Sequence, residues 1–233
     1  MTKKITRRVA IAGLSAISLA PVLAQSAKPE GTITIAHGFT PGGNVDLTAR
    51  LIAERLAAKL GQQVIVEPKP GAGGSTAAAQ VARAAPDGTT LFLAAGGHAV
   101  SAAIYNKLPY DALKDFSWIS MLSDFPFVFV TYPDHPAKHL REFIAMAKDE
   151  PVKLLCATPG NGTGQHLALE LFAAAAGVKV QHVPYRGSPQ AATDLLGKRV
   201  DAFMDNMTVV AEMVRDALLG RPVPHQHLFR LNR

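Results

Sequence analysis

Two glycine-rich turns carry the residues of this sequence that are best suited to binding chemistry. One is Thr40-Pro41-Gly42-Gly43 and the other is Gly160-Asn161-Gly162, and each leads into an expected helix. The N–H groups in the first turn of a helix have no partner within it, and the helix dipole adds partial positive charge there. Glycines leave this backbone open to a ligand. Each turn therefore predicts an anion site, and two such sites facing one another would suit a dicarboxylate.

Two observations leave other interpretations of these turns open. The glycines could serve only to form tight turns, although the same arrangement occurs twice, since Thr163 and Gly164 continue the second turn. Asp46 lies in the first turn of the first helix, where its carboxylate could satisfy the helix dipole or cap the helix. It could also repel a ligand carboxylate or contact an amine or hydroxyl of the ligand.

Histidines near the expected turns could donate hydrogen bonds to a carboxylate. His37, His98 and His166 lie in such positions, and for each of them a packing or capping role is an equal alternative. His135 and His139 are four residues apart, but a proline lies between them at an expected helix start. We interpret them as a solvated surface pair rather than as a metal site. No metal and no cofactor are expected.

Motifs typical of enzymes are incomplete in this sequence. The run Gly71-Ala72-Gly73-Gly74-Ser75-Thr76 begins like a dinucleotide-binding fingerprint but has a threonine where the third glycine belongs. No Walker A lysine follows a glycine turn, and no Gly-x-Ser-x-Gly nucleophile elbow is present. Cys156 is the only cysteine, and its apolar setting predicts a buried strand thiol. We expect no enzyme; the alternative is a hydrolase or isomerase on an α/β scaffold.

The elements that position both turns are expected to alternate between strands and helices. Strands are predicted over residues 32–36, 64–67, 90–94, 125–131 and 154–157. Helices are predicted over 44–60, 76–84 and 163–176. Asn44 is the expected N-cap of the first helix. Gly61 and Gly177 are expected to end two of the helices. This order indicates parallel sheets with covered faces, in which ligands bind beyond the carboxyl ends of the strands.

Two similar halves are indicated by a repeated spacing of glycine and proline. Gly61-x6-Pro68-x2-Gly71 matches Gly177-x6-Pro184-x2-Gly187 in residue type and spacing, and each run starts at a helix end and crosses a predicted strand. Internal repetition of this kind is a signature of repeated supersecondary units. We therefore expect two related α/β halves, with the chain crossing from one to the other near Ser123.

Residues 1–24 have the pattern of a signal peptide cut after Ala24. A basic start precedes an apolar run from Val9 to Leu23, and small residues occupy the usual cleavage positions. The run is about 15 residues long, short of the roughly 20 that span a bilayer. The Arg7-Arg8 pair resembles a twin-arginine export signal, and ordinary secretory export is the alternative. The mature chain is therefore expected in the periplasm.

The net charge excludes nucleic acid as an expected partner. The chain has a formal charge of +6, but four of its 24 basic residues and none of its 18 acidic ones lie in the expected signal peptide, which leaves +2. The remaining basic residues are scattered among acids rather than gathered in a patch. A binder of acidic polymers would be expected to keep such a patch.

Seven segments, in order along residues 32–207, give the chain a specific resemblance to a known family. It resembles the tripartite tricarboxylate transporter receptor family, also called the Bug family of periplasmic solute receptors. The segments are Phe39-Thr40-Pro41-Gly42-Gly43-Asn44-Val45-Asp46, Glu67-Pro68-Lys69-Pro70-Gly71-Ala72-Gly73-Gly74, Ala84-Ala85-Pro86-Asp87-Gly88, Tyr105-Asn106-Lys107-Leu108-Pro109-Tyr110-Asp111, Gly160-Asn161-Gly162-Thr163, His182-Val183-Pro184-Tyr185-Arg186-Gly187-Ser188 and Asp201-Ala202-Phe203-Met204-Asp205-Asn206.

The resemblance implies a two-lobed α/β periplasmic binding protein, or Venus flytrap, with lobe one at residues 25–123 and lobe two at residues 124–220. It implies a monomer that holds a di- or tricarboxylate, an acidic amino acid or an aromatic acid between its lobes. The partner would be a membrane permease of one large and one small subunit. The residues to which it carries a ligand-binding role are Phe39, Gly43, Asn44, Asp46, His98, Gly162, Thr163, His166, Tyr185 and Asp205.

The sequence departs from the family pattern at a few positions and at its end. The family more often has serine or threonine at position 44, and His37 and Thr40 are also unusual. Family members continue for roughly another 80 to 90 residues, whereas here an atypical tail at 221–233 follows lobe two. We therefore expect a fold that is incomplete at the C-terminus, with an uncovered sheet edge in lobe one. A non-functional fragment of such a receptor is the alternative function.

Overall fold

The computed structural model describes residues 30–218 and 228–230. The expected signal peptide lies outside the described residues, as does most of the atypical tail. By its contacts, the chain from Gly31 onward forms one unit that contains both sheets. We call β1–β3 with α1–α3 lobe one, and β4–β8 with α4–α7 lobe two. The expected division of the chain near residue 123 stays a prediction.

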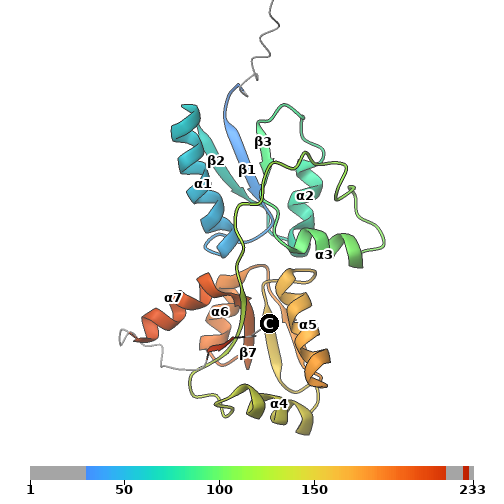
Figure 1. The fold of residues 1–233 in the computed structure, drawn as a ribbon, viewed down its shortest axis with the longest axis vertical. Coiled ribbons are helices and arrows are strands. Elements are labelled where there is room, and N and C mark those ends of the chain that lie inside the picture. The colour runs from blue at the N-terminus through green and yellow to red at the C-terminus, as the bar shows by residue number, and fades with distance from the viewer. Residues whose placement is uncertain (1–29, 219–227, 231–233) are drawn as a thin grey trace, which may run out of the picture. The chain divides into compact units, whose positions relative to one another are not determined.

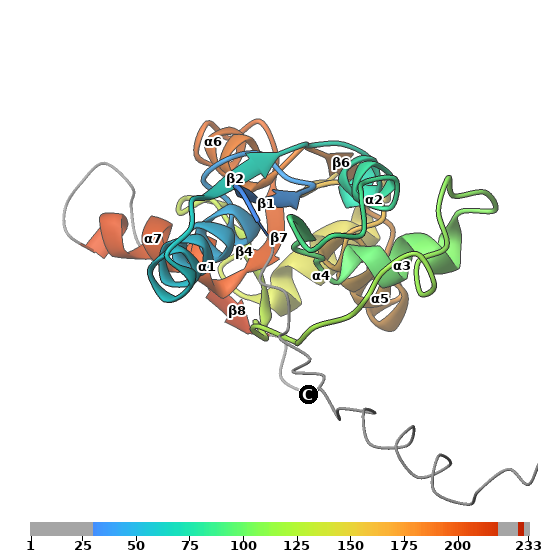
Figure 2. The same cartoon turned by 90° about the horizontal axis from the view of Figure 1, so that it is seen from above.

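Lobe one is built on a three-stranded parallel sheet in the order β2-β1-β3. Helix α1 lies on one side of the strands and helices α2 and α3 lie on the other (Figures 1 and 2). The elements are β1 (Ile33–His37), α1 (Asn44–Leu60), β2 (Val64–Pro68), a 3₁₀ turn (Ala72–Gly74), α2 (Ser75–Val81), β3 (Thr90–Phe92) and α3 (Gly97–Ile104).

Helix α1 packs on this sheet through small residues rather than through its leucines. Ala49 and Ala53 are buried against Ile35, whereas Leu47 and Leu51 are 47% and 66% exposed. The leucine spacing correctly predicted a helix, but Leu47 and Leu51 lie outside its buried face. The expected cap at Asn44 is wrong by one residue, because Gly43 is the N-cap and no side chain caps the helix. The expected stop is confirmed, since Gly61 closes α1 in a left-handed conformation.

Lobe two is built on a five-stranded sheet in the order β6-β5-β7-β4-β8. Its core strands β5, β6 and β7 are parallel, but β4 runs antiparallel to β7 and to β8, so the expectation of purely parallel sheets is wrong here. The elements are β4 (Phe127–Thr131), α4 (Leu140–Asp149), β5 (Leu155–Thr158), α5 (Gly164–Ala176), β6 (Gln181–Pro184), α6 (Ser188–Leu196), β7 (Ala202–Asn206), α7 (Met207–Leu218) and β8 (Leu228–Arg230).

Successive residues of the lobe-two strands fill two cores, one on each face of the sheet, because side chains of a strand alternate between its faces. Phe129, Cys156 and Met204 belong to the core that also contains Phe143 of α4 and Leu169 of α5. The neighbouring strand residues Val128, Ala157 and Phe203 belong to the other core, with Leu195 of α6. Cys156 is fully buried, as expected, and this burial raises the pKa of its thiol.

The expected repeat is confirmed in the backbone. In each lobe a strand, a helix and a second parallel strand follow one another, and the third parallel strand lies on the opposite side of the first, giving β2-β1-β3 and β6-β5-β7. Gly61 and Gly177 end the two helices with φ values of 59° and 63°. Pro68 and Pro184 end the two second strands. The glycine and proline spacing thus marks equivalent turns of two related units.

Lobe one presents an open sheet edge and exposed apolar side chains. Strand β3 pairs only with β1 among the described strands. In the segment that follows α3, the side chains of Trp118, Ile119 and Met121 are between 57% and 83% exposed. Exposed apolar patches and free edges favour association with other chains. None of the described helices has the length and apolar character needed to cross a membrane.

Glycines allow the backbones of the two lobes to approach closely. A Cβ atom at Gly73 of lobe one would overlap with the carbonyl oxygen of Asn161 in lobe two. A Cβ at Gly97 would lie 2.9 Å from the carbonyl oxygen of Gly162. A Cβ at Gly187 of lobe two would overlap with the Thr40 side chain of lobe one. Side chains at these positions would hold the lobes apart.

Replacing Gly73 with alanine should therefore destabilise the protein by about 2–4 kcal/mol. The left-handed φ of 62° accounts for about 1 kcal/mol, and the overlap with Asn161 accounts for the remainder. Gly61→Ala is the matched control, because its φ is 59° and no atom lies within 4 Å of the added Cβ. Urea unfolding of both variants measures the difference. Equal losses would contradict the close approach of the two backbones.

Candidate functional site

Each predicted glycine turn meets turns of the other lobe, the first those before α6 and α7, and the second those of Gly73 and Gly97. The Thr40 N–H donates to the carbonyl oxygen of Arg186, at 3.3 Å. The Thr208 hydroxyl, at the start of α7, donates to Asn44 Oδ1 at the start of α1, at 2.8 Å. The carboxyl ends of β1, β5 and β7 thus supply one candidate site, as expected for parallel α/β sheets.

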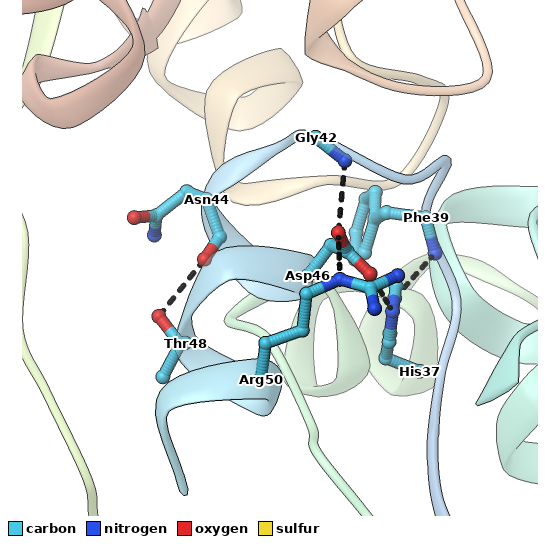
Figure 3. Close-up of polar contacts among 7 residues, drawn as sticks. All are labelled: His37, Phe39, Gly42, Asn44, Asp46, Thr48 and Arg50. Atoms are coloured by element: carbon cyan, nitrogen blue, oxygen red, sulfur yellow. Dashed lines mark hydrogen bonds and ion pairs between the residues drawn. The ribbon is translucent and has the colours of Figure 1, made fainter. Parts of the chain in front are cut away.

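The start of α1 contains its own carboxylate (Figure 3). Asp46 Oδ2 accepts hydrogen bonds from the Gly42 N–H and from Arg50 Nε, both at 2.9 Å. Asp46 Oδ1 lies 3.1 Å from His37 Nε2, and His37 Nδ1 accepts from the Phe39 N–H at 3.4 Å. The expectation that the amides of this turn are free is therefore wrong for Gly42. Asp46 spans the turn and fixes its shape.

Hydrogen bonding, rather than burial, decides the charge of Asp46. Burial alone would raise the pKa of this carboxyl, but the hydrogen bonds from Arg50, Gly42 and His37 outweigh it and hold the pKa below its usual value. Burial lowers the pKa of His37, against the opposing effect of Asp46. Asp46 is thus ionised and His37 is neutral near pH 7, with the His37 proton on Nε2, where it can donate to Asp46.

Amides at the start of α1 are left over. The N–H groups of Gly43, Asn44, Val45 and Asp46 make no hydrogen bond to any described residue, as geometry requires for the first residues of a helix. Gly43 is buried, and a Cβ placed on it would lie 3.7 Å from the Ser188 hydroxyl of lobe two. The available anion site of lobe one therefore lies one residue further along the chain than Gly42.

The second predicted turn, at the start of α5, is held by neutral groups. Thr163 is the N-cap, and its hydroxyl accepts from the His166 N–H at 3.1 Å and donates to the Gly160 carbonyl at 2.8 Å. The Gly162 N–H donates to His166 Nδ1 at 3.2 Å, so the expectation of a free amide is wrong at Gly162 too. Among the described residues, the N–H groups of Gly164 and Gln165 have no partner.

Two histidines stack behind this turn. The rings of His166 and His182 are nearly parallel with centroids 4.0 Å apart, and His182 Nε2 lies 2.7 Å from the Thr158 hydroxyl. Burial, with a further contribution from His166, lowers the pKa of His182 to about 4.

Asp205 lies beneath the starts of α5 and α6 at the end of β7. It is fully buried, and its Oδ1 accepts from Gln165 Nε2 at 2.9 Å and from the Asn206 N–H at 2.7 Å. Its Oδ2 is buried without a hydrogen-bond partner among the described residues. Burial raises the pKa of Asp205 to about 6, against the opposing influence of Ser188, Gln165 and Asn206.

Phe39 and His98 come together in lobe one, where they line a small, mainly apolar pocket with Gly73, Gly74 and Phe92. His98 Nε2 donates to the Ala112 carbonyl at 2.9 Å, and its buried Nδ1 has no partner among the described residues. Tyr185 is engaged elsewhere, because its hydroxyl donates to Asp194 in lobe two at 2.7 Å. Its polar group is therefore already occupied.

The histidine pair considered for metal binding is not a surface pair. His135 is buried, so the expectation of a solvated side chain is wrong there, and its Nδ1 accepts from the Ala137 N–H at 3.1 Å. His139 is exposed. Across residues 30–218 and 228–230, no group of three or more histidine, cysteine or acidic side chains is arranged to hold a metal ion.

Sequence reasoning missed Gln165, Ser188 and Thr208. Gln165 bonds Asp205, Ser188 lies close to Gly43, and Thr208 bonds Asn44. A signal was available for Ser188, because a glycine followed by Ser-Pro is typical of a helix start. The contacts of Gln165 and Thr208 join residues 40 and 164 positions apart, and no local pattern indicates them.

Comparisons with known proteins agree with this architecture. A family model described as "Tripartite tricarboxylate transporter family receptor" matches residues 48–220. Protein BugT of Bordetella pertussis is 36% identical over 219 residues, which cover 92% of this chain and 67% of BugT. Against three other curated relatives, the chain spans between 56% and 65% of their length.

Two solved structures resemble this fold at appreciable sequence identity. The periplasmic binding protein BugD superposes with a TM-score of 0.78 at 32% identity, covering 88% of this chain and 68% of BugD. MatC from Rhodopseudomonas palustris, solved with bound malate, gives a TM-score of 0.77 at 33% identity, covering 81% of this chain and 65% of MatC. The two-lobed α/β fold expected from the sequence is thus confirmed.

Replacing Asp46 with alanine should cost about 2–4 kcal/mol of stability. The change leaves buried His37 Nε2 and the Gly42 N–H without their acceptor. Arg50→Ala is the matched control, because it removes only the 54% exposed side chain that pairs with Asp46, and should cost less than about 1 kcal/mol. Denaturant unfolding at neutral pH compares them. An Asp46 variant as stable as the Arg50 variant would show that the carboxylate does not fix the turn.

Acid should weaken the fold through His182. The pKa of His182 in the folded protein, about 4, is lower than the ordinary histidine value of 6.5, so the folded state binds fewer protons. The corresponding stability is present above pH 6.5 and is lost as the pH falls from 6.5 towards 4. Between pH 7 and pH 5 we expect the wild type to lose about 1–2 kcal/mol more than His182→Gln. Parallel pH profiles of unfolding free energy for the two proteins would contradict this.

Proposed function

Because this chain belongs to the tripartite tricarboxylate transporter receptor family, we propose that it is a periplasmic receptor that captures a small organic carboxylate. The solute would be a di- or tricarboxylate, an acidic amino acid or an aromatic acid. Its family and its solved relatives are binding proteins rather than enzymes, and the chain performs no chemistry on the solute. The bound malate of MatC supports a dicarboxylate as the first solute to test.

The observation that carries this proposal is the set of unbonded amides at two helix starts, one in each lobe. Gly43, Asn44 and Val45 supply three N–H groups from lobe one, and Gly164 and Gln165 supply two from lobe two. Such groups bind carboxylate oxygens through hydrogen bonds and the helix dipole. A carboxylate held from both sides binds more tightly when the lobes are together, so the solute favours the closed state.

The two helix starts contribute unequally to the binding of an anion. The first turn of α1 contains the ionised Asp46, whereas the first turn of α5 contains no acidic residue and is capped by the neutral Thr163. A ligand carboxylate at α1 approaches an existing negative charge, which weakens attraction there. Within the first turn itself, the start of α5, with Gly162, Thr163 and the residues that follow, thus opposes a ligand carboxylate less than the start of α1, although the buried Asp205 lies beneath it.

The side chains of the site take distinct roles under this proposal. Asp46 positions the first turn through Gly42 and makes no direct contact with the solute, since both its oxygens are occupied. His166 positions the second turn in the same way through Gly162. Phe39 and His98 contact the uncharged part of the solute. Tyr185 contributes by packing in lobe two, because its hydroxyl already bonds Asp194.

Direct bonds between the lobes assist closure. The bonds Thr208–Asn44 and Thr40–Arg186 join lobe one directly to lobe two. A hinge motion that makes and breaks these bonds, together with the solute's own contacts, is a common device of two-lobed proteins. The closed monomer would then be recognised by a membrane permease of one large and one small subunit, after export by the signal peptide expected at residues 1–24.

Calorimetric titration of the mature chain with succinate, malate, citrate, glutamate and benzoate tests the proposal. At least one acid should bind with one-to-one stoichiometry, because its carboxylate completes the amides of both turns. The diamide of the acid that binds best is the matched control. It has nearly the same shape without the charge and should bind at least about tenfold more weakly.

Circular dichroism and a thermal melt are run on the same sample. A sharp transition with no binding to any of the acids would overturn the proposal. A broad, non-cooperative transition would instead favour the alternative, a non-functional fragment of such a receptor. The open β3 edge and the exposed side chains of Trp118 and Met121 are the specific features that favour that alternative.

A further inference from the structure

Asp205 has one carboxylate oxygen that makes no hydrogen bond of good geometry in the described protein, although the nearby Ser188 hydroxyl acts to lower the pKa of Asp205. Oδ1 accepts two hydrogen bonds, from Gln165 Nε2 and the Asn206 N–H, while Oδ2 is buried without a partner. The residue has no exposed surface. An ionised carboxylate in such a place is costly, because no counter-charge from the described residues stabilises the buried oxygen.

No cation of the described residues compensates Asp205. Among the elements packed against β7, β4 has no titratable side chain and β5 has only the buried thiol of Cys156. Helix α5 contributes His166 and Glu170, which lie 3.6 Å from one another, and α6 contributes Asp194, which pairs with Arg199. The described side chains of α7 carry no charge.

Asp205 differs from Asp46, the other buried acid near a helix start, in the partners that surround it. Asp46 lies by the start of α1 and has Arg50, the Gly42 N–H and His37 as partners. Asp205 lies by the starts of α5 and α6 and has only neutral donors. Asp46 is therefore kept as an anion, whereas Asp205 is about half protonated near pH 6.

A solute carboxylate at lobe two would come close to Asp205. Gln165 links the two directly, since its backbone N–H is one of the unbonded amides at the start of α5 and its side chain bonds Asp205. Ser188, the first residue of α6, lies close to both Asp205 and the Gly43 turn. Two carboxylates that share a site of low polarity cannot both stay ionised without a large cost, and one of them takes up a proton.

We propose that Asp205 takes up one proton when a solute carboxylate binds, so that it faces the solute as a neutral carboxylic acid with a proton on Oδ2. This inference rests on the proposed function. The proton comes from solvent and forms an O–H bond at the oxygen that now lacks a partner. That O–H group is a hydrogen-bond donor, and the nearest new acceptor is the bound carboxylate. The site thus selects ionised acids and couples their capture to pH.

The direction of the pH effect follows from this coupling. Binding raises the proton affinity of Asp205, so the solute binds more tightly as the pH falls, until Asp205 is already protonated in the free protein near pH 6. The dissociation constant can change by at most tenfold per pH unit for one proton. From about pH 8 to about pH 6.5 we expect it to fall by roughly 3- to 10-fold.

Proton uptake is measured directly by titrating the mature chain with succinate at about pH 7 in two buffers of different ionisation enthalpy. Succinate has no hydroxyl or amine that could donate to an ionised Asp205, and its carboxyls stay ionised at this pH. The wild type should take up between about 0.3 and 1 proton per bound succinate. This measurement needs no variant and so does not depend on how any substitution folds.

Asp205→Asn supplies the second measurement. Asparagine has the same shape as the neutral acid, so the variant should take up no proton, should lose the pH dependence, and should bind succinate about 3- to 10-fold more tightly than the wild type at pH 8. Asp149→Asn, at the exposed end of α4, is the matched control that removes the same charge from lobe two and should behave like the wild type.

Proton release on binding, no proton exchange, or uptake that persists in Asp205→Asn would each overturn the inference while leaving the carboxylate receptor intact. A variant that binds more weakly than the wild type at every pH would overturn it as well, because Asp205 would then act as an ionised acceptor. Failure of succinate and of every other acid to bind a well-folded chain would remove the proposed function, and this inference with it.

Discussion

The first N–H groups of a helix cannot be bonded within it, and the arrangement of both lobes depends on how this requirement is met. At the start of α1, the Asp46 carboxylate accepts a hydrogen bond from the Gly42 N–H. At the start of α5, the Thr163 hydroxyl accepts from the His166 N–H and the His166 ring accepts from the Gly162 N–H. These internal partners fix the shape of each turn. The amides that remain are the ones a bound anion can use, and the turns are rigid because their neighbours are already satisfied.

The choice of glycine at the turns has a second consequence, since it sets how closely the lobes can approach. Gly73, Gly97 and Gly187 lie where any side chain would strike the backbone or side chains of the other lobe. Close approach brings the starts of α1, α5, α6 and α7 together. It also removes water from between them, which strengthens every electrostatic interaction in that space. The burial of Asp205 and its unpartnered oxygen are therefore two aspects of one packing arrangement.

The sequence was sufficient for features that depend on local geometry. The ends of α1 and α5 at Gly61 and Gly177, and the repeat between the lobes, follow from residues that only certain backbone conformations accept. Features that depend on contacts between distant segments were missed or misjudged. His135 is buried although it lies in a turn between Asp134 and Pro136, and the fully buried residues of α1 include alanines but no leucine. The free or bonded state of Gly42 and Gly162 depends on where Asp46 and His166 point, which periodicity does not determine.

The proposed binding mode requires five backbone amides to be available to a carboxylate. Amide NMR during a titration with an acid that binds tests this requirement most directly. The N–H signals of Gly43, Asn44, Val45, Gly164 and Gln165 should move downfield as the acid is added, because each gains a charged acceptor. The signals of Gly42 and Gly162 should move much less, because they keep Asp46 and His166 as partners. Large shifts confined to residues outside both helix starts would contradict the account.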